Sequence, residues 1–110
     1  VHKLGKETRK GNYGGYLILK HKIKDQTFYS LYGHLKTPHK LKLGQKIFAG
    51  QQLARIGKES DSGGWFCHLH LQIITPEAMN EGYSEWGYIS DKLLTKVEDY
   101  FPNPNFLFKW

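Results

Sequence analysis

The pattern of apolar and polar positions predicts a chain built mainly from short β-strands. Runs rich in aromatic and β-branched residues are separated by glycine-containing or polar turns, which is the pattern of strands joined by hairpins and short loops. We therefore predict strands over residues 13–21, 27–34, 46–48, 52–57 and 68–74.

Helical periodicity is confined to the tail, residues 76–110. Residues 76–87 are predicted to form a loop. Within residues 88–100, apolar side chains recur close to the spacing of a helix: Ile89, Leu93, Leu94 and Val97. Pro102 and Pro104 would end that helix, because proline removes a backbone donor. The pattern predicts a mainly β fold, an antiparallel sheet or β-sandwich with a short C-terminal helix, in a single domain over residues 1–110.

The last predicted strand carries the most distinctive chemistry of the chain. Side chains two residues apart on a strand point to the same face, so His68, His70 and Gln72 are expected to share one face. The other face would be apolar and would enter the core, and it would consist of Cys67, Leu69, Leu71 and Ile73. Two imidazoles about 7 Å apart on a rigid strand can converge on one ion, or one can bind a metal while the other handles a proton. The alternative is a half-exposed strand that happens to carry two histidines, because HxH is a short pattern.

Composition and charge narrow the class of protein. A length of 110 residues with 39% hydrophobic content suits one compact domain. The single Cys67 excludes an internal disulfide, and its expected apolar face predicts a buried thiol. The net charge of +6 includes a cluster at Lys36, Lys40, Lys42 and Lys46. These lysines could face an anionic polymer, but without a nucleic-acid motif they are interpreted as solvated edge and loop charges, and no nucleic acid or membrane partner is expected.

A second histidine motif, Tyr32-Gly33-His34-Leu35, ends the strand predicted over residues 27–34. It is followed by the glycine-punctuated block GQKIFAGQQLARIG at residues 44–57 and by GGWFCHLHLQI at residues 63–73. This ordered set, spanning residues 12–75, resembles the zinc metallopeptidases of the lysostaphin/LytM type, the M23 peptidases, which cut peptide bonds in bacterial cell walls.

The resemblance implies a role for each histidine. Zinc in this family is held by a histidine and an aspartate of an HxxxD motif and by the second histidine of HxH, which is His70 here. The first histidine of HxH, His68, would be the general base that takes a proton from the zinc-bound water. His34 would lie across the cleft and stabilise or orient the tetrahedral intermediate. Three protein ligands leave zinc an open position, at which the pKa of water falls toward ~7.

The HxxxD motif of the family is expected before the strand at residues 13–21, where this chain has no such motif. The spacing does occur at His21 and Asp25. We interpret that pair as a solvated hairpin tip, because residues four apart on a strand are about 13 Å distant. The expectation is therefore that the chain is a fragment whose first half-site lies upstream, that it binds zinc weakly or not at all, and that it has no peptidase activity alone.

Functions from other classes remain open. A degenerate M23-like module could bind a partner or wall peptide without zinc. A two-histidine phosphotransfer domain could use His34 and His68 but leaves His70 without a role, and a biotinyl or lipoyl carrier lacks its lysine turn. The expected partner is a peptidoglycan peptide, with fusion to or association with a larger protein. Localisation is open: periplasmic or extracellular by the resemblance, cytoplasmic within a larger fusion.

Overall fold

The computed structural model describes residues 1–8, 12–83 and 97–105, and its centre is one antiparallel sheet. Its four strands lie in the order of the sequence, each hydrogen-bonded to the next. They are β1 (Lys3–Lys6), β2 (Gly15–Ile23), β3 (Gln26–Leu35) and β4 (His70–Ile74). The prediction of a mainly β, antiparallel fold is confirmed. No helix among the described residues has the length and apolar character needed to cross a membrane.

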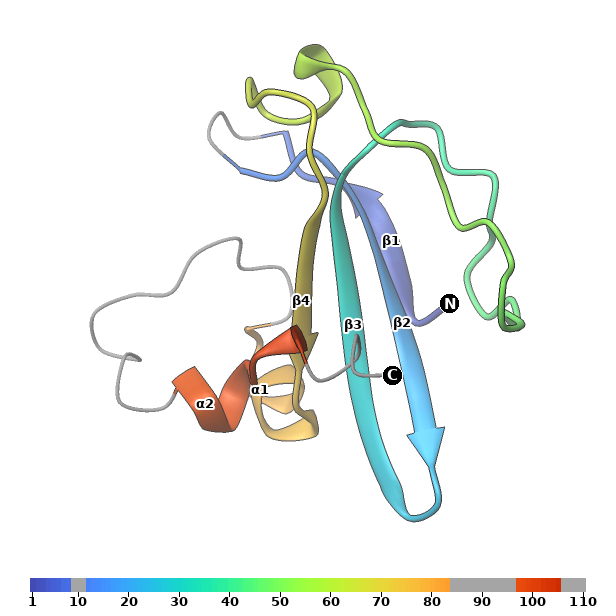
Figure 1. Ribbon diagram of the computed structural model, residues 1–110, viewed down its shortest axis with the longest axis vertical. Helices are drawn as coiled ribbons and strands as arrows, with labels where there is room; N and C mark the ends of the chain where they lie inside the picture. Colours follow the sequence, from blue (N-terminus) through green and yellow to red (C-terminus); the bar gives the residue numbers. More distant parts are fainter. Residues whose placement is uncertain (9–11, 84–96, 106–110) are drawn as a thin grey trace.

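The hairpin of β2 and β3 is the longest element of the sheet (Figure 1). Ile23 pairs with Gln26, so the turn consists of Lys24 and Asp25, and Lys24 has a φ of 55°. Positive φ at the start of a two-residue turn matches the twist of the flanking strands. The hairpin therefore has a closed end at residues 24 and 25 and an open end at Gly15 and Leu35.

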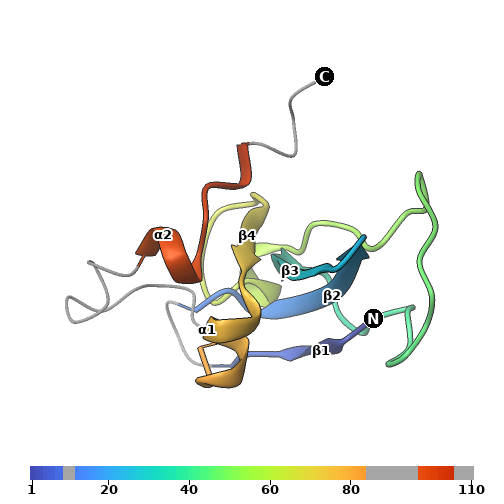
Figure 2. The same cartoon turned by 90° about the horizontal axis from the view of Figure 1, so that it is seen from below.

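Each face of the sheet buries its own apolar cluster. Alternate residues of the strands point to opposite faces: Tyr16 and Ile18 pack with the residues of the two α-helices, whereas Leu17 and Leu19 lie beneath the long connection 36–58. Figures 1 and 2 show the helices on one side of the sheet and this connection on the other. The sheet is thus the middle layer, and only its helical side carries α-structure among the described residues.

Residues 76–87, predicted as a loop, begin with the short helix α1 (Pro76–Asn80), so that prediction is wrong for this stretch. The Thr75 side chain accepts a hydrogen bond from the backbone N–H of Ala78, and proline occupies the first turn. Both are standard helix-start features. The second helix, α2 (Val97–Tyr100), falls at the end of the helix predicted over residues 88–100. The preceding part of that prediction lies outside the described residues.

The connection 36–58 contains no strand, so the predictions at residues 46–48 and 52–57 are wrong. Gly44 and Gly50, with φ of 81° and 80°, turn the chain twice within a few residues. At its two ends Leu35 bridges Ile56, and the backbone N–H of Lys36 donates to the carbonyl of Arg55 over 2.8 Å. Its middle is tied to the start of the chain, where the N–H of Gly44 donates to the carbonyl of Val1 over 2.8 Å and the amino group of Val1 donates to the carbonyl of Gln45 over 2.6 Å. The segment covers the sheet as an extended loop and contributes side chains rather than backbone to the core.

The histidine strand begins later than predicted, at His70 instead of His68, and β1 was not predicted as a strand. Because residues 67–69 precede the strand, their side chains do not follow its alternation. Cys67 is exposed, and Leu69 is 46% exposed. The predicted burial of both side chains, including the buried thiol, is wrong, whereas Ile73 is buried as expected.

Candidate functional site

His34 lies at the open end of the hairpin, on an irregularity of β3. Leu17 pairs with Tyr32 and Gly15 pairs with Leu35, so β3 carries one more residue than β2 between these two pairs. Such a bulge turns a side chain out of the regular alternation. His34 has a φ of 61°, a conformation that is uncommon for residues other than glycine.

Backbone contacts on both sides hold His34 in this conformation. Its N–H donates to the carbonyl of Tyr13 over 2.7 Å, and its carbonyl accepts from the N–H of Gly57 over 2.8 Å. The side chain is 4% exposed. A strained backbone persists where its surroundings determine it, and such positions cluster at functional sites. The bulge therefore places a buried imidazole at a defined point.

Gly33 lets two side chains meet above the sheet. It is the partner of His70 across the β3–β4 ladder. A Cβ atom added to Gly33 would lie 2.9 Å from the Cβ of Tyr13 and 3.2 Å from the Cβ of His70. The absence of a side chain at Gly33 thus allows Tyr13 and His70 to approach, with ring centroids 5.8 Å apart.

The structure brings together the three histidines singled out from the sequence. The ring centroid of His34 lies 4.0 Å from that of His68 and 6.1 Å from that of His70. The ring centroid of the exposed Phe66 lies 4.6 Å from that of His68. Residues 34 and 68–70, far apart in sequence, meet because β3 and β4 are paired.

The His21 and Asp25 pair lies elsewhere. His21 pairs with Phe28, which is six residues along β3 from His34, or about 20 Å of strand. Asp25 lies in the turn beyond it. These two residues therefore belong to the closed end of the hairpin and do not contribute to the histidine cluster.

Hydrogen bonds fix which nitrogen of each clustered ring carries its proton. Carbonyl oxygens accept only, so Nδ1–H of His34 donates to the Ser62 carbonyl over 3.2 Å, and Nδ1–H of His68 donates to the Phe66 carbonyl over 2.7 Å. Nε2 of His70 lies 3.0 Å from Oε1 of Gln72, and with the Gln72 amide assigned in this orientation the Nε2–H of His70 is the donor. In the neutral form, each ring is left with one unprotonated nitrogen: Nε2 of His34, Nε2 of His68 and Nδ1 of His70.

Burial lowers the pKa of His34 below its ordinary value of 6.5. Repulsion from His68 and His70 acts in the same direction, and the hydrogen bond to Ser62 opposes it. Desolvation disfavours the charged imidazolium. His34 is consequently neutral at neutral pH, which keeps its Nε2 lone pair available.

Ser62 is the most important positioning residue that the sequence interpretation missed. It is completely buried, and its hydroxyl donates a hydrogen bond to the carbonyl of Trp65 over 2.8 Å. Its own carbonyl accepts the hydrogen bond from Nδ1–H of His34. A Cβ on Gly63 would lie 2.2 Å from the carbonyl oxygen of Asn12, so the loop packs closely on the chain before β2. The glycine pair at residues 63–64 was the available signal for this turn.

The donor chemistry of the cluster fits zinc, although the described residues do not complete a site. Neutral imidazole with a free lone pair is a common zinc ligand, and His70 offers Nδ1 in that state. Among residues 1–8, 12–83 and 97–105, however, no group of three or more His, Cys, Asp or Glu side chains is placed to hold one metal ion. The three rings are neighbours without converging on one point.

Comparison with known proteins supplies the family. Residues 2–82 match the sequence model of peptidase family M23, which is more than half of the chain and includes β1 to β4, α1 and all three clustered histidines. No curated protein and no solved structure matches the chain. The extent of the family match is sufficient for assignment, and the chain belongs to peptidase family M23.

Proposed function

We propose that this M23 domain is part of a zinc-dependent metallo-endopeptidase that acts on peptides of the bacterial cell wall. The observation that carries the proposal is the cluster of His34, His68 and His70, in which each ring has one nitrogen fixed as a donor and the other left as an acceptor. Peptidoglycan peptides are the substrate expected from the family.

His70 is the proposed metal ligand, through Nδ1. Its ring is oriented from two sides, by the hydrogen bond to Gln72 and by contact with Tyr13. A hydrogen bond on the second nitrogen is the usual way in which proteins orient a histidine ligand. A zinc ion at this position supplies Lewis acidity and lowers the pKa of a water molecule toward neutrality.

His68 is the proposed general base. Its Nε2 is the free acceptor, because Nδ1–H is held by the carbonyl of Phe66. The ring is half-buried, so water reaches it. A neutral imidazole whose proton acceptor faces the site suits removal of a proton from the attacking water near pH 7.

His34 is proposed to orient the reacting groups rather than to donate a proton at the start. With Nδ1–H directed at Ser62, its neutral ring presents an acceptor at Nε2. Its ring lies beside that of His68, at 4.0 Å between centroids. Through this acceptor His34 would hold the attacking water or a donor group of the substrate beside His68.

A complete site needs further donors, because catalytic zinc takes three protein ligands and His70 is one. We propose that a histidine and an aspartate from an upstream HxxxD segment of the parent protein supply the other two. His21 and Asp25 are unsuitable, since they lie at the opposite end of β3.

The decisive experiment measures cleavage of cell-wall peptides by the full-length parent protein. Cleavage should stop with a chelator and return with zinc. His70→Ala should abolish it and His68→Ala should reduce it by at least about 100-fold, whereas His21→Ala is the matched control and should retain it. Activity that survives both His70→Ala and His68→Ala would refute the proposal.

The 110-residue chain alone should hold less than one equivalent of zinc after dialysis and should cleave no peptide. Elemental analysis measures this directly. Stoichiometric zinc would show that this chain or a partner chain supplies the missing donors. Zinc binding restored by adding upstream residues with an HxxxD motif would support the assignment of His70.

A second candidate function is a non-catalytic M23 module that binds wall peptide without metal. The observation that favours it is the lack of a three-donor group among the described residues. A full-length parent protein that binds peptidoglycan peptides yet contains no zinc and cleaves none of them would establish this second function.

A further inference from the structure

A pocket lies between the two ends of the connection 36–58. Its walls are residues 36–41 on one side and residues 52–55 on the other, and its volume is about 530 Å³. This volume falls within the range of sites for small organic ligands. The backbone bond between Lys36 and Arg55 fixes the two walls to each other where they leave the sheet.

The pocket combines an apolar floor with a cationic rim. Leu41, Leu53 and Ala54 line it and pack against the apolar cluster on that face of the sheet. Lys36, Lys40 and Arg55 also line it, and their side chains are exposed. None of the ten lining residues is acidic.

The segment of the chain around the pocket is positively charged as well. Residues 26–58 contain six lysine or arginine residues and no aspartate or glutamate. In the rest of the chain ten basic and ten acidic residues balance, so the net charge of +6 is carried by this one segment. A one-sign cluster raises the local concentration of oppositely charged ligands, and the pocket opens within it.

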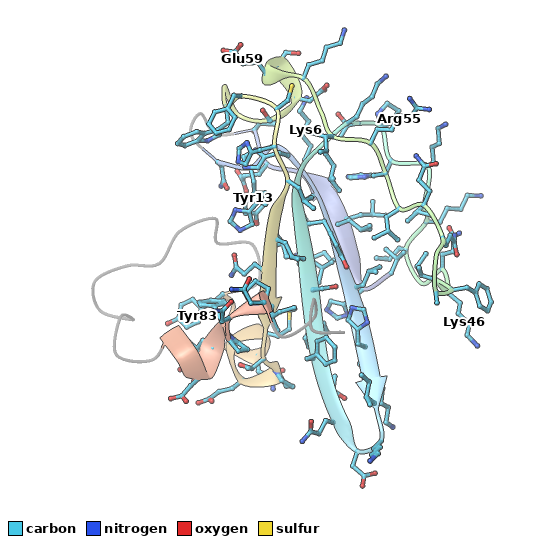
Figure 3. All side chains as sticks on the ribbon, in the orientation of Figure 1. Lys6, Tyr13, Lys46, Arg55, Glu59 and Tyr83 are labelled. Atoms are coloured by element: carbon cyan, nitrogen blue, oxygen red, sulfur yellow. The ribbon has the colours of Figure 1, made fainter. Side chains whose placement is uncertain are left out.

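This pocket is separate from the histidine cluster. His70 and its neighbour Tyr13 lie on the side of the sheet that packs with α1 and α2, whereas the connection 36–58 covers the other side. Figure 3 shows the labelled Arg55 and Lys46 on that connection, away from Tyr13. The peptidase proposal therefore makes no use of the pocket.

We propose that the pocket binds an organic anion of small-molecule size, with its acidic group at Lys36 and Arg55 and its apolar body on Leu41 and Leu53. Arginine offers a planar set of donors that matches carboxylate, sulfonate or phosphate oxygens. A bare inorganic anion would leave the apolar floor uncovered. The lining contains no Phe, Tyr or Trp side chain on which nucleic-acid bases could stack, and the Nε2 atom of its one imidazole, His39, is hydrogen-bonded to the Gly5 carbonyl.

The test uses two dyes that differ by one acidic group, anilinonaphthalene sulfonate and the neutral phenylnaphthylamine. The 110-residue chain should bind the sulfonate dye saturably and at least about tenfold more tightly than the neutral dye. Backbone amide NMR shifts should locate the sulfonate at residues 36–41 and 52–55. Equal affinity for the two dyes, or shifts confined to the exposed Trp65 and Phe66, would overturn the proposal.

Two double variants distinguish binding in the pocket from attraction of the dye to the net positive charge of the segment. The double variant Lys36→Gln, Arg55→Gln should lower the affinity for the sulfonate dye by about tenfold or more. The backbone hydrogen bond between these two residues does not involve their side chains and is retained. Lys42→Gln with Lys46→Gln removes the same charge from the same segment outside the lining and should change the affinity less than about threefold. Equal losses in the two double variants would show attraction to net charge alone.

Discussion

The two ends of the β2–β3 hairpin both carry histidine, and they use it differently. At the open end, three imidazoles from two strands and a loop lie together, each with one free acceptor nitrogen. At the closed end, His21 is part of the packing of a regular strand pair, with its ring stacked on Phe28 at 4.7 Å. A histidine becomes a candidate for chemistry through what surrounds it, and sequence spacing alone does not distinguish the two ends.

The hydrogen bonds of Ser30 make the difference explicit. Nε2 of His21 shares a hydrogen bond of 2.7 Å with the Ser30 hydroxyl, and this hydroxyl also lies 3.3 Å from the Tyr32 hydroxyl. Ser30 is 1% exposed, so its hydroxyl is not accessible to a substrate. A serine–histidine contact at the closed end therefore stabilises the sheet and gives no activated nucleophile.

The largest expected effect on stability concerns the support of the open end. Gly14→Ala should lower the free energy of unfolding by about 3 kcal/mol or more, because φ is 60° and the new Cβ would lie 1.8 Å from the Asp61 carbonyl oxygen. Gly50→Ala is the control: φ is 80° but nothing lies within 4 Å, so about 1 kcal/mol is expected. Urea denaturation measures both. Equal losses of stability in the two variants would mean that the backbone at Asp61 does not pack against Gly14.

An effect of intermediate size distinguishes His21, which stabilises the sheet, from His70, the proposed metal ligand. His21→Ala should lower stability by about 1 kcal/mol, since Ser30 loses one hydrogen bond and stays buried. It should leave unchanged the response of the chain to zinc, measured as the shift of the imidazole nitrogen-15 signals when zinc is added. His70→Ala should abolish that response with a loss of stability of similar size, because both histidines are half-buried and each makes one side-chain hydrogen bond. A zinc response lost in His21→Ala would reverse the assignment of the two ends.

The smallest expected effect is a pH dependence that the two ends share. Burial is the first cause of the lowered pKa of both His34 and His21. Below pH 6.5 the unfolded chain therefore binds protons before the folded chain does, and stability falls as the pH decreases through this range. His34→Asn tolerates positive φ and, like His21→Asn, should make the fall shallower. Denaturation between pH 7.5 and pH 5 tests this, and a stability that rises on acidification would contradict it.

Much of the fold was predictable from local pattern, because runs of apolar, aromatic and β-branched residues mark β2, β3 and β4. The failures have physical causes. Gly44 and Gly50 turn a β-like sequence into a loop, and the exposed Cys67 shows that the ladder, not the sequence period, determines where alternation begins. Helix α1 was predictable in principle from Thr75 and Pro76, which are common residues at a helix start.

The site was predictable in residue type and less so in geometry. The sequence indicated His34, His68 and His70, but their proximity depends on pairing Gly33 with His70, which are far apart along the chain. Two features of the site have no local sequence signature: the bulge at His34 and the buried Ser62 carbonyl that accepts the hydrogen bond from this histidine. Each depends on a backbone conformation that distant contacts determine. The roles of the three histidines stay predictions until they are tested.

The central claim is that the open end, and not the closed end, responds to zinc, with His70 as the ligand through Nδ1. Nitrogen-15 NMR of the imidazole rings during zinc titration of the 110-residue chain tests it most directly. Without metal, His34 and His68 should be protonated at Nδ1 and His70 at Nε2. Added zinc should shift Nδ1 of His70 first and leave His21 unchanged. A first shift at His21, or a His70 ring protonated at Nδ1 before zinc is added, would contradict the account.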